Sequence, residues 1–154
     1  MASLAELVTR TEVRPKVVQA CASLIDAEVR SKSGLSALAI KAGYKLVLAV
    51  RPTMVADVVD RLLPEFAEAI QPMFVESQQE SARSGRPLPA VFEAQVAGDP
   101  PRVAGALLSV TDRRAQKASG PLRKTYDRLR DTADAHVRAA VPGLARALAP
   151  FTVG

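Results

Sequence analysis

The sequence predicts an all-α protein: a compact bundle of about six to seven helices around a central apolar helix at residues 35–50. Three observations support this fold class. The chain has 154 residues, 48% hydrophobic and 24% charged, so it can bury a core without a disulfide or a metal. Its 11 prolines and 8 glycines fall mostly between segments with helical periodicity. No segment keeps the apolar-polar alternation of a strand. We therefore expect one domain over residues 1–154.

The first part of the chain is expected to form four helices. A short helix spans residues 3–9, and Pro15 opens a second that runs to about residue 32. The helix at 35–50 is apolar around nearly its whole circumference, with only Lys41 and Lys45 on a polar line, and is therefore expected to be central.

The fourth helix, from residue 53 to about 81, keeps its apolar stripe in phase across Pro64, where we expect a kink or short break. The remaining expected helices span residues 90–97, 102–118 and 121–140. Breaks rich in Gly, Ser or Pro separate them, and Pro142 is expected to open a last short turn.

Three stretches, spread over most of the chain, carry a family resemblance. Residues 26–36 read DAEVRSKSGLS, residues 107–115 read LLSVTDRRA, and residues 126–130 read YDRLR. Together they resemble a family of small all-helical domains of unknown function from high-GC bacteria. The resemblance implies an all-helical fold and a bacterial cytoplasmic setting, and it implies no catalytic residue.

The inventory of reactive side chains argues against catalysis and metal binding. The chain has one Cys, one His and no Trp. Cys21 has no neighbouring Cys or His that would complete a zinc or redox spacing. His136 has no acidic residue three or four positions before it, and one His cannot supply a di-iron site with two Glu-x-x-His pairs. We therefore predict a protein that is not an enzyme and has no cofactor or metal.

The same sequence features indicate a cytoplasmic location. The N-terminus does not resemble a secretory signal, because Glu6 and Arg10 interrupt its apolar residues. The most apolar stretch, residues 33–50, contains Lys41 and Lys45, so we expect no membrane span.

Glu28 is the first candidate site residue. It lies near the centre of the apolar stripe of the second helix, where a carboxylate is unusual. Because a buried Glu usually has a cationic partner, we expect a buried ion pair with Lys32, Lys41 or Lys45. A catalytic acid with a raised pKa is the alternative. Cys21, on the same stripe, is expected to be a core residue.

Basic side chains concentrate in the C-terminal part. Residues 1–98 carry 11 basic and 11 acidic side chains and residues 99–154 carry 10 and 5, so the whole net charge of +5 lies after residue 98. Seven basic residues surround one helix-to-helix turn, and we call them the basic turn: Arg113, Arg114, Lys117, Arg123, Lys124, Arg128 and Arg130. This cluster is a candidate surface for phosphate, an acidic protein or an anionic membrane.

The alternative for the basic turn is a solvated surface with helical ion pairs, namely Arg123 with Asp127, Arg130 with Asp134, and Asp134 with Arg138.

The leading functional interpretation is a non-enzymatic protein-interaction module whose partner is an unidentified protein or a second copy. The first alternative is sequence-independent nucleic-acid binding through the basic turn, although aromatic residues at 4% argue against base stacking. The second alternative is an apolar small molecule held against the helix at 35–50.

Overall fold

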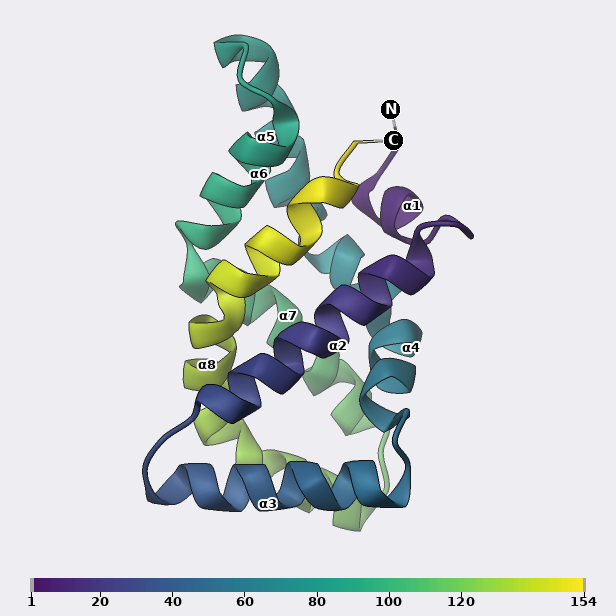
Figure 1. Ribbon diagram of the computed structural model, residues 1–154, viewed down its shortest axis with the longest axis vertical. Coiled ribbons are helices and arrows are strands. Elements are labelled where there is room, and N and C mark those ends of the chain that lie inside the picture. The colour runs from purple at the N-terminus through teal and green to yellow at the C-terminus, as the bar shows by residue number, and fades with distance from the viewer. Residues whose placement is uncertain (1, 154) are drawn as a thin grey trace.

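The described part of the chain consists of eight α-helices and one short 3-10 helix (Figure 1). The computed structural model describes residues 2–153, with the side chains of all of these except Leu35 and Ser36. The elements are, in chain order, α1 (Leu4–Val8), α2 (Arg14–Ser31), α3 (Leu35–Val50), α4 (Met54–Ala69), α5 (Gln71–Ser84), α6 (Leu88–Ala97), α7 (Pro100–Gln116), α8 (Gly120–Leu148) and η1 (Ala149–Phe151). No strand occurs within residues 2–153, so the all-α prediction is confirmed.

The helix predicted over residues 53–81 is two helices, and the break lies at Ile70 rather than at Pro64. α4 continues through Pro64, which has no N–H to donate to the carbonyl of Asp60. The Nη2 of Arg14 donates to that carbonyl instead, at 2.6 Å, while its Nε contacts the Asp60 carboxylate at 2.6 Å. α5 can begin directly after this break because Pro72 stands in its first turn, where a missing N–H leaves no helical bond unmade.

Pro142 is also accommodated inside a helix. The predicted helix 121–140 and the predicted last turn are one element, α8, which continues through Pro142 to Leu148. Figure 1 shows α8 bending in its C-terminal half, and an internal proline is a common cause of such a bend.

The best-buried side chains gather at the end of the molecule that carries both termini (Figure 1). Phe74 of α5 meets Phe92 of α6 edge to face, with ring centroids 6.1 Å apart and an interplanar angle of 76°. Leu4 and Val141 are fully buried in the same apolar cluster. This cluster ties α1, α5 and α6 to the C-terminal half of α8.

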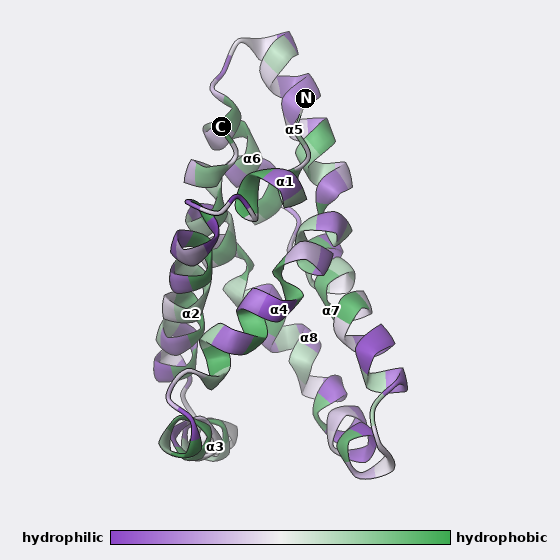
Figure 2. Cartoon of the chain, turned by 90° about the vertical axis from the view of Figure 1, so that its right-hand side faces the viewer, coloured by the Kyte–Doolittle hydropathy of each residue, from purple (hydrophilic) through white to green (hydrophobic). Residues whose placement is uncertain are grey.

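The prediction that residues 35–50 form the central helix is wrong. α3 lies across the opposite end of the bundle and contacts only α2 and α4 extensively (Figures 1 and 2). Of its described side chains only Ala37 is buried, whereas Leu38 and Leu46 are each 67% exposed. A sequence that is apolar all round usually marks a buried helix, but apolarity does not specify which neighbours fill the core. Here the core cluster is filled by α1, α2 and α4 to α8, and no described side chain of α3 belongs to it.

The apolarity of α3 does not make it a membrane span. No helix in the described range combines the length and apolar character needed to cross a bilayer.

Candidate functional site

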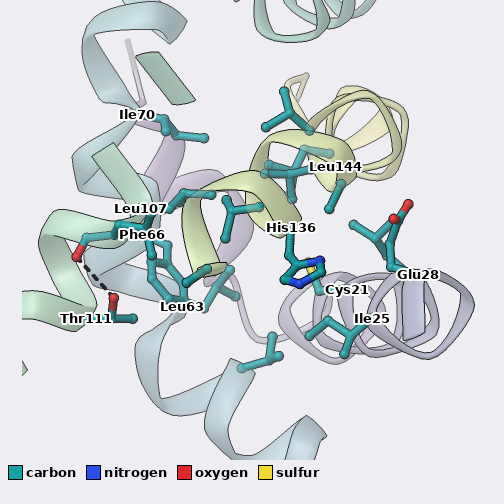
Figure 3. A pocket seen from close by; sticks show the side chains of 18 of the residues that line it. Cys21, Ile25, Glu28, Leu63, Phe66, Ile70, Leu107, Thr111, His136 and Leu144 are labelled. Carbon is teal, nitrogen blue, oxygen red and sulfur yellow. Dashed lines mark hydrogen bonds between the residues drawn. The ribbon is translucent and has the colours of Figure 1, made fainter. Parts of the chain in front are cut away.

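An apolar groove of about 520 Å³ lies between α2, α4, α7 and α8 (Figure 3). Leu4 and Val8 of α1 close one end, and Ile40 of α3 borders the other. Most of the lining side chains are Leu, Ile, Val, Ala or Phe. The exceptions are Cys21, Glu28, Lys32, Thr111, Thr132 and His136.

Two helical stripes supply the long walls. α2 and its C-cap Lys32 contribute residues spaced at three or four positions from Cys21 onwards, and α8 does the same from Leu129 to Leu148. The sequence predicted both stripes as core-facing. It missed that they do not close on each other along their whole length, so part of each stripe lines a groove instead of a filled core.

The two long walls of the groove, α2 and α8, approach each other closely at one point. At Gly143 of α8 an added Cβ would lie only 2.4 Å from the Cδ1 of Leu24 on α2. Glycine therefore allows this close approach of the two helices. Figure 2 shows that away from this region the helices spread apart towards α3 and the turn between α7 and α8.

Glu28 and Lys32 lie at the edge of the groove. The Nζ of Lys32 is 4.0 Å from the Oε2 of Glu28, and the two side chains are 18% and 28% exposed. Lys41 and Lys45 line a separate hollow between α2 and α3, beside Asp26 and Tyr44. The structure therefore brings together Glu28 and Lys32 of the predicted set and places Lys41 and Lys45 apart from them.

Cys21 and His136 both line the groove, although the sequence gave no reason to group them. In Figure 3 the imidazole of His136 points from α8 towards α2, which carries Cys21. Burial raises the pKa of the Cys21 thiol to about 11, so at neutral pH it is a protonated and uncharged group. Within residues 2–153 no group of three His, Cys, Asp or Glu side chains is arranged to hold a metal ion.

A hydrogen-bonded network supports the α7–α8 wall. The hydroxyls of Thr111 and Tyr126 lie 2.8 Å apart, Tyr126 donates to Asp112, and the Nε of Arg130 donates to Asp112 at 2.9 Å. The hydrogen bond from Arg130, with that from Tyr126, lowers the pKa of Asp112. The polar atom that Thr111 presents to the groove is therefore already bonded.

The basic turn divides into paired and unpaired residues. Arg114 pairs with Glu65 of α4, and Arg130 pairs with Asp112. The other five are exposed and have no carboxylate within ion-pair distance in the described part of the chain: Arg113, Lys117, Arg123, Lys124 and Arg128.

Of the helical ion pairs expected around this turn, Arg138 pairs with Asp134 at 2.7 Å. Arg130 uses Asp112 of α7 instead of Asp134 on its own helix. Arg123 and Asp127 do not form an ion pair. One of the three helical ion pairs expected around the basic turn is therefore present.

Fold and site together define a small helical bundle with one large apolar groove and a basic end. A family model described as a family of unknown function (DUF6918) matches residues 4–152, so the chain belongs to that family. The expected resemblance to an all-helical family of unknown function is confirmed. No curated protein matches the chain. No solved structure matches it either.

Proposed function

We propose that the protein binds an apolar small molecule, of the class of a single acyl chain, in the groove between α2, α4, α7 and α8. The observation that carries this proposal is the groove itself. Its volume of about 520 Å³ falls within the range of about 300–1,000 Å³ usual for small-molecule sites. Apolar side chains surround it on several sides, and such a lining favours ligands that release apolar surface from water.

The polar groups in the groove suit binding better than chemistry. The Cys21 thiol is protonated at neutral pH, and thiolate is the form that acts as a nucleophile. Thr111 already bonds Tyr126, and Glu28 lies beside Lys32. His136 is the remaining ionisable side chain in the lining, without an acidic partner in its own helical turn. A non-enzymatic role therefore remains our proposal.

The interpretation as a protein-interaction module and its nucleic-acid alternative stay predictions. Neither rests on a contact described above, whereas the groove is a specific geometric feature. The proposal keeps the apolar ligand of the third interpretation from sequence but places it mainly against α2, α4, α7 and α8, with Ile40 contributed by α3 to the lining.

Native mass spectrometry of freshly purified protein and displacement of a fluorescent fatty acid test this proposal. Ala133 lines the groove and Ala135, on the same helix, is exposed, so Ala133→Phe fills the groove while Ala135→Phe is its matched control. Each methylene buried contributes about 0.8 kcal/mol, so affinity should rise about fourfold per methylene until the groove is full. Ala133→Phe should weaken binding at least tenfold and Ala135→Phe should leave it unchanged.

Two results would contradict the proposal. The first is that no acyl chain of any length displaces the probe. The second is that Ala133→Phe, with native circular dichroism, binds as well as Ala135→Phe.

A further inference from the structure

Exposed apolar side chains collect at one end of the molecule. Figures 1 and 2 agree in placing α3 and the turn between α7 and α8 at the same end, opposite the termini. Among the described residues, six of the nine exposed large apolar side chains lie on α3 or on the first part of α8: Leu38, Leu46, Val47, Val50, Leu122 and Leu129. A cluster of apolar side chains exposed to water is unfavourable, and such a cluster usually marks an interaction surface.

α3 has one face against the bundle and one face free. Ala37, Tyr44 and Leu48 are buried or half-buried on the inner face. At about 100° per residue, Leu38, Leu46 and Val50 fall on the opposite side of the helix. Their exposed fractions are 67%, 67% and 78%. The free face is therefore an apolar stripe along the whole helix, with Lys45 exposed at its border.

The same end carries the unpaired cations. Arg113, Lys117, Arg123, Lys124 and Arg128 are exposed around the turn between α7 and α8, beside Leu122 and Leu129. Asp127 is the acidic residue among them. Positive charge predominates on the α8 rim, and Lys45 adds to it on the α3 rim.

We infer that this end docks on an anionic lipid bilayer. Leucine and valine side chains flanked by lysine and arginine are what an interfacial helix presents to acyl chains and phosphate headgroups. In Figure 2, α3 and the turn between α7 and α8 reach the same level at this end of the molecule, so a flat surface can contact the exposed side chains of both at once.

The charge and the exposed apolar side chains of this end together favour an anionic bilayer over other occupants. A nucleic acid engages the cations but leaves the exposed leucines and valines in water. A second copy meeting this end symmetrically brings two basic ends into one interface, and like charges oppose that contact. An anionic bilayer satisfies both the apolar and the basic side chains.

The groove opens at the same end. Leu129 lines the groove and is also 60% exposed, and Ile40 of α3 belongs to the same lining. Docking therefore places the open mouth of the groove against the acyl chains of the bilayer. This link to the ligand rests on the proposed function, whereas docking itself does not.

Vesicle flotation tests the docking surface, with phosphatidylcholine vesicles compared with vesicles of phosphatidylcholine and phosphatidylglycerol in equal parts. The protein should float with the anionic vesicles and detach as salt rises. Leu46→Glu on one rim and Leu122→Glu on the other should each abolish most flotation. Each basic side chain near a membrane surface contributes about fivefold in partitioning, so Arg123→Glu with Lys124→Glu should weaken it about 25-fold or more.

Matched variants at the opposite end serve as controls. Val153→Glu replaces an apolar side chain that is 56% exposed near the C-terminus, and Arg83→Glu with Arg86→Glu makes the same charge change at the turn between α5 and α6. Both should float like the unaltered protein. Ala133→Phe, which fills the groove, should also float, so failure of ligand binding is distinguishable from failure of docking.

Absence of flotation, equal flotation with both kinds of vesicle, or flotation that is unchanged by the rim variants would overturn the inference. A dimer in sedimentation equilibrium that dissociates on Leu46→Glu, or a shifted duplex probe without flotation, would assign this end to another occupant. Circular dichroism establishes that each variant is folded. If either leucine variant does not fold, the double variant Arg123→Glu with Lys124→Glu, at two exposed side chains, still tests docking.

Discussion

Leu24 of α2 and Gly143 of α8 meet so closely that a Cβ on Gly143 would lie 2.4 Å from the Cδ1 of Leu24. The contact holds the two groove walls together at one end and lets them diverge at the other.

Gly143→Ala should therefore lack the stabilisation that the same substitution gives elsewhere. Gly105 of α7 has nothing within 4 Å of an added Cβ, so Gly105→Ala should stabilise the fold by about 0.5–1 kcal/mol. Gly143→Ala should be less stable than Gly105→Ala by about 1–3 kcal/mol, because Leu24 must shift. Urea denaturation measures both. In a Leu24→Ala background the difference should vanish, and a difference that persists would contradict the contact.

Glu28→Ala should cost little. A fully buried pair broken from one side would lose about 3–5 kcal/mol. Here the Lys32 and Glu28 side chains are 18% and 28% exposed and the charges are 4.0 Å apart, so the loss in free energy of unfolding should be below about 1 kcal/mol. The urea midpoint measures it, with Glu28→Gln as the variant that keeps the side-chain volume. A loss above about 3 kcal/mol would indicate a buried pair.

Cys21 should react slowly with thiol reagents in the folded protein. Burial raises its pKa from 9.0 to about 11, which lowers the thiolate fraction at pH 8 by about two orders of magnitude. Stopped-flow absorbance with a disulfide reagent should show a rate that rises with pH to about 11 and increases sharply in urea. An acyl ligand in the groove should slow it further. Rapid reaction of the native protein at pH 8 would place Cys21 in contact with water.

Acid should weaken the α7–α8 wall through Asp112. Arg130 and Tyr126 lower the pKa of this carboxyl in the folded state. A lowered pKa contributes stability above the unfolded value of about 4 and loses it as pH falls through the folded value. The Asp112 side chain is 39% exposed, so the contribution should not exceed about 1 kcal/mol.

Urea midpoints from pH 5 down to pH 2 measure this loss. In Asp112→Asn the urea midpoint should fall less steeply as pH decreases. Asp131→Asn makes the same charge change at another exposed position and should leave the pH dependence of the midpoint unchanged. If the pH dependence of the urea midpoint is unchanged in Asp112→Asn, the hydrogen bonds to Asp112 do not contribute to stability.

Sequence periodicity predicted the helices and the core-facing stripes of α2 and α8, because spacing at three or four residues determines which side chains share a face. It could not predict the groove, because whether two stripes meet depends on where the helices cross, and the close approach of Gly143 to Leu24 is a long-range contact. α3 was misplaced for a related reason. Its apolar residues surround the helix, and hydropathy does not distinguish a face covered by protein from a face left free.

The prolines show a second limit. A kink or short break is expected at Pro64, but α4 continues through it, and Arg14, 50 positions earlier in the sequence, bonds the carbonyl of Asp60 that Pro64 leaves free. The residues that neighbour Pro64 in the sequence give no indication of such a long-range contact. The break falls just before Pro72 instead, where α5 begins and the Met73 and Phe74 N–H groups bond the carbonyl of Ile70.

The edge-to-face contact of Phe74 and Phe92 has a consequence for how the fold opens. The helices that share this cluster should exchange their amide hydrogens only through global unfolding, whereas α3, with one buried side chain among those described, should exchange through a local opening of much lower free energy. The molecule thus comprises a slow-exchanging unit at the termini and a fast-exchanging one at α3. Local opening of this kind occurs in microseconds to seconds, so the second should rearrange while the first keeps the chain folded.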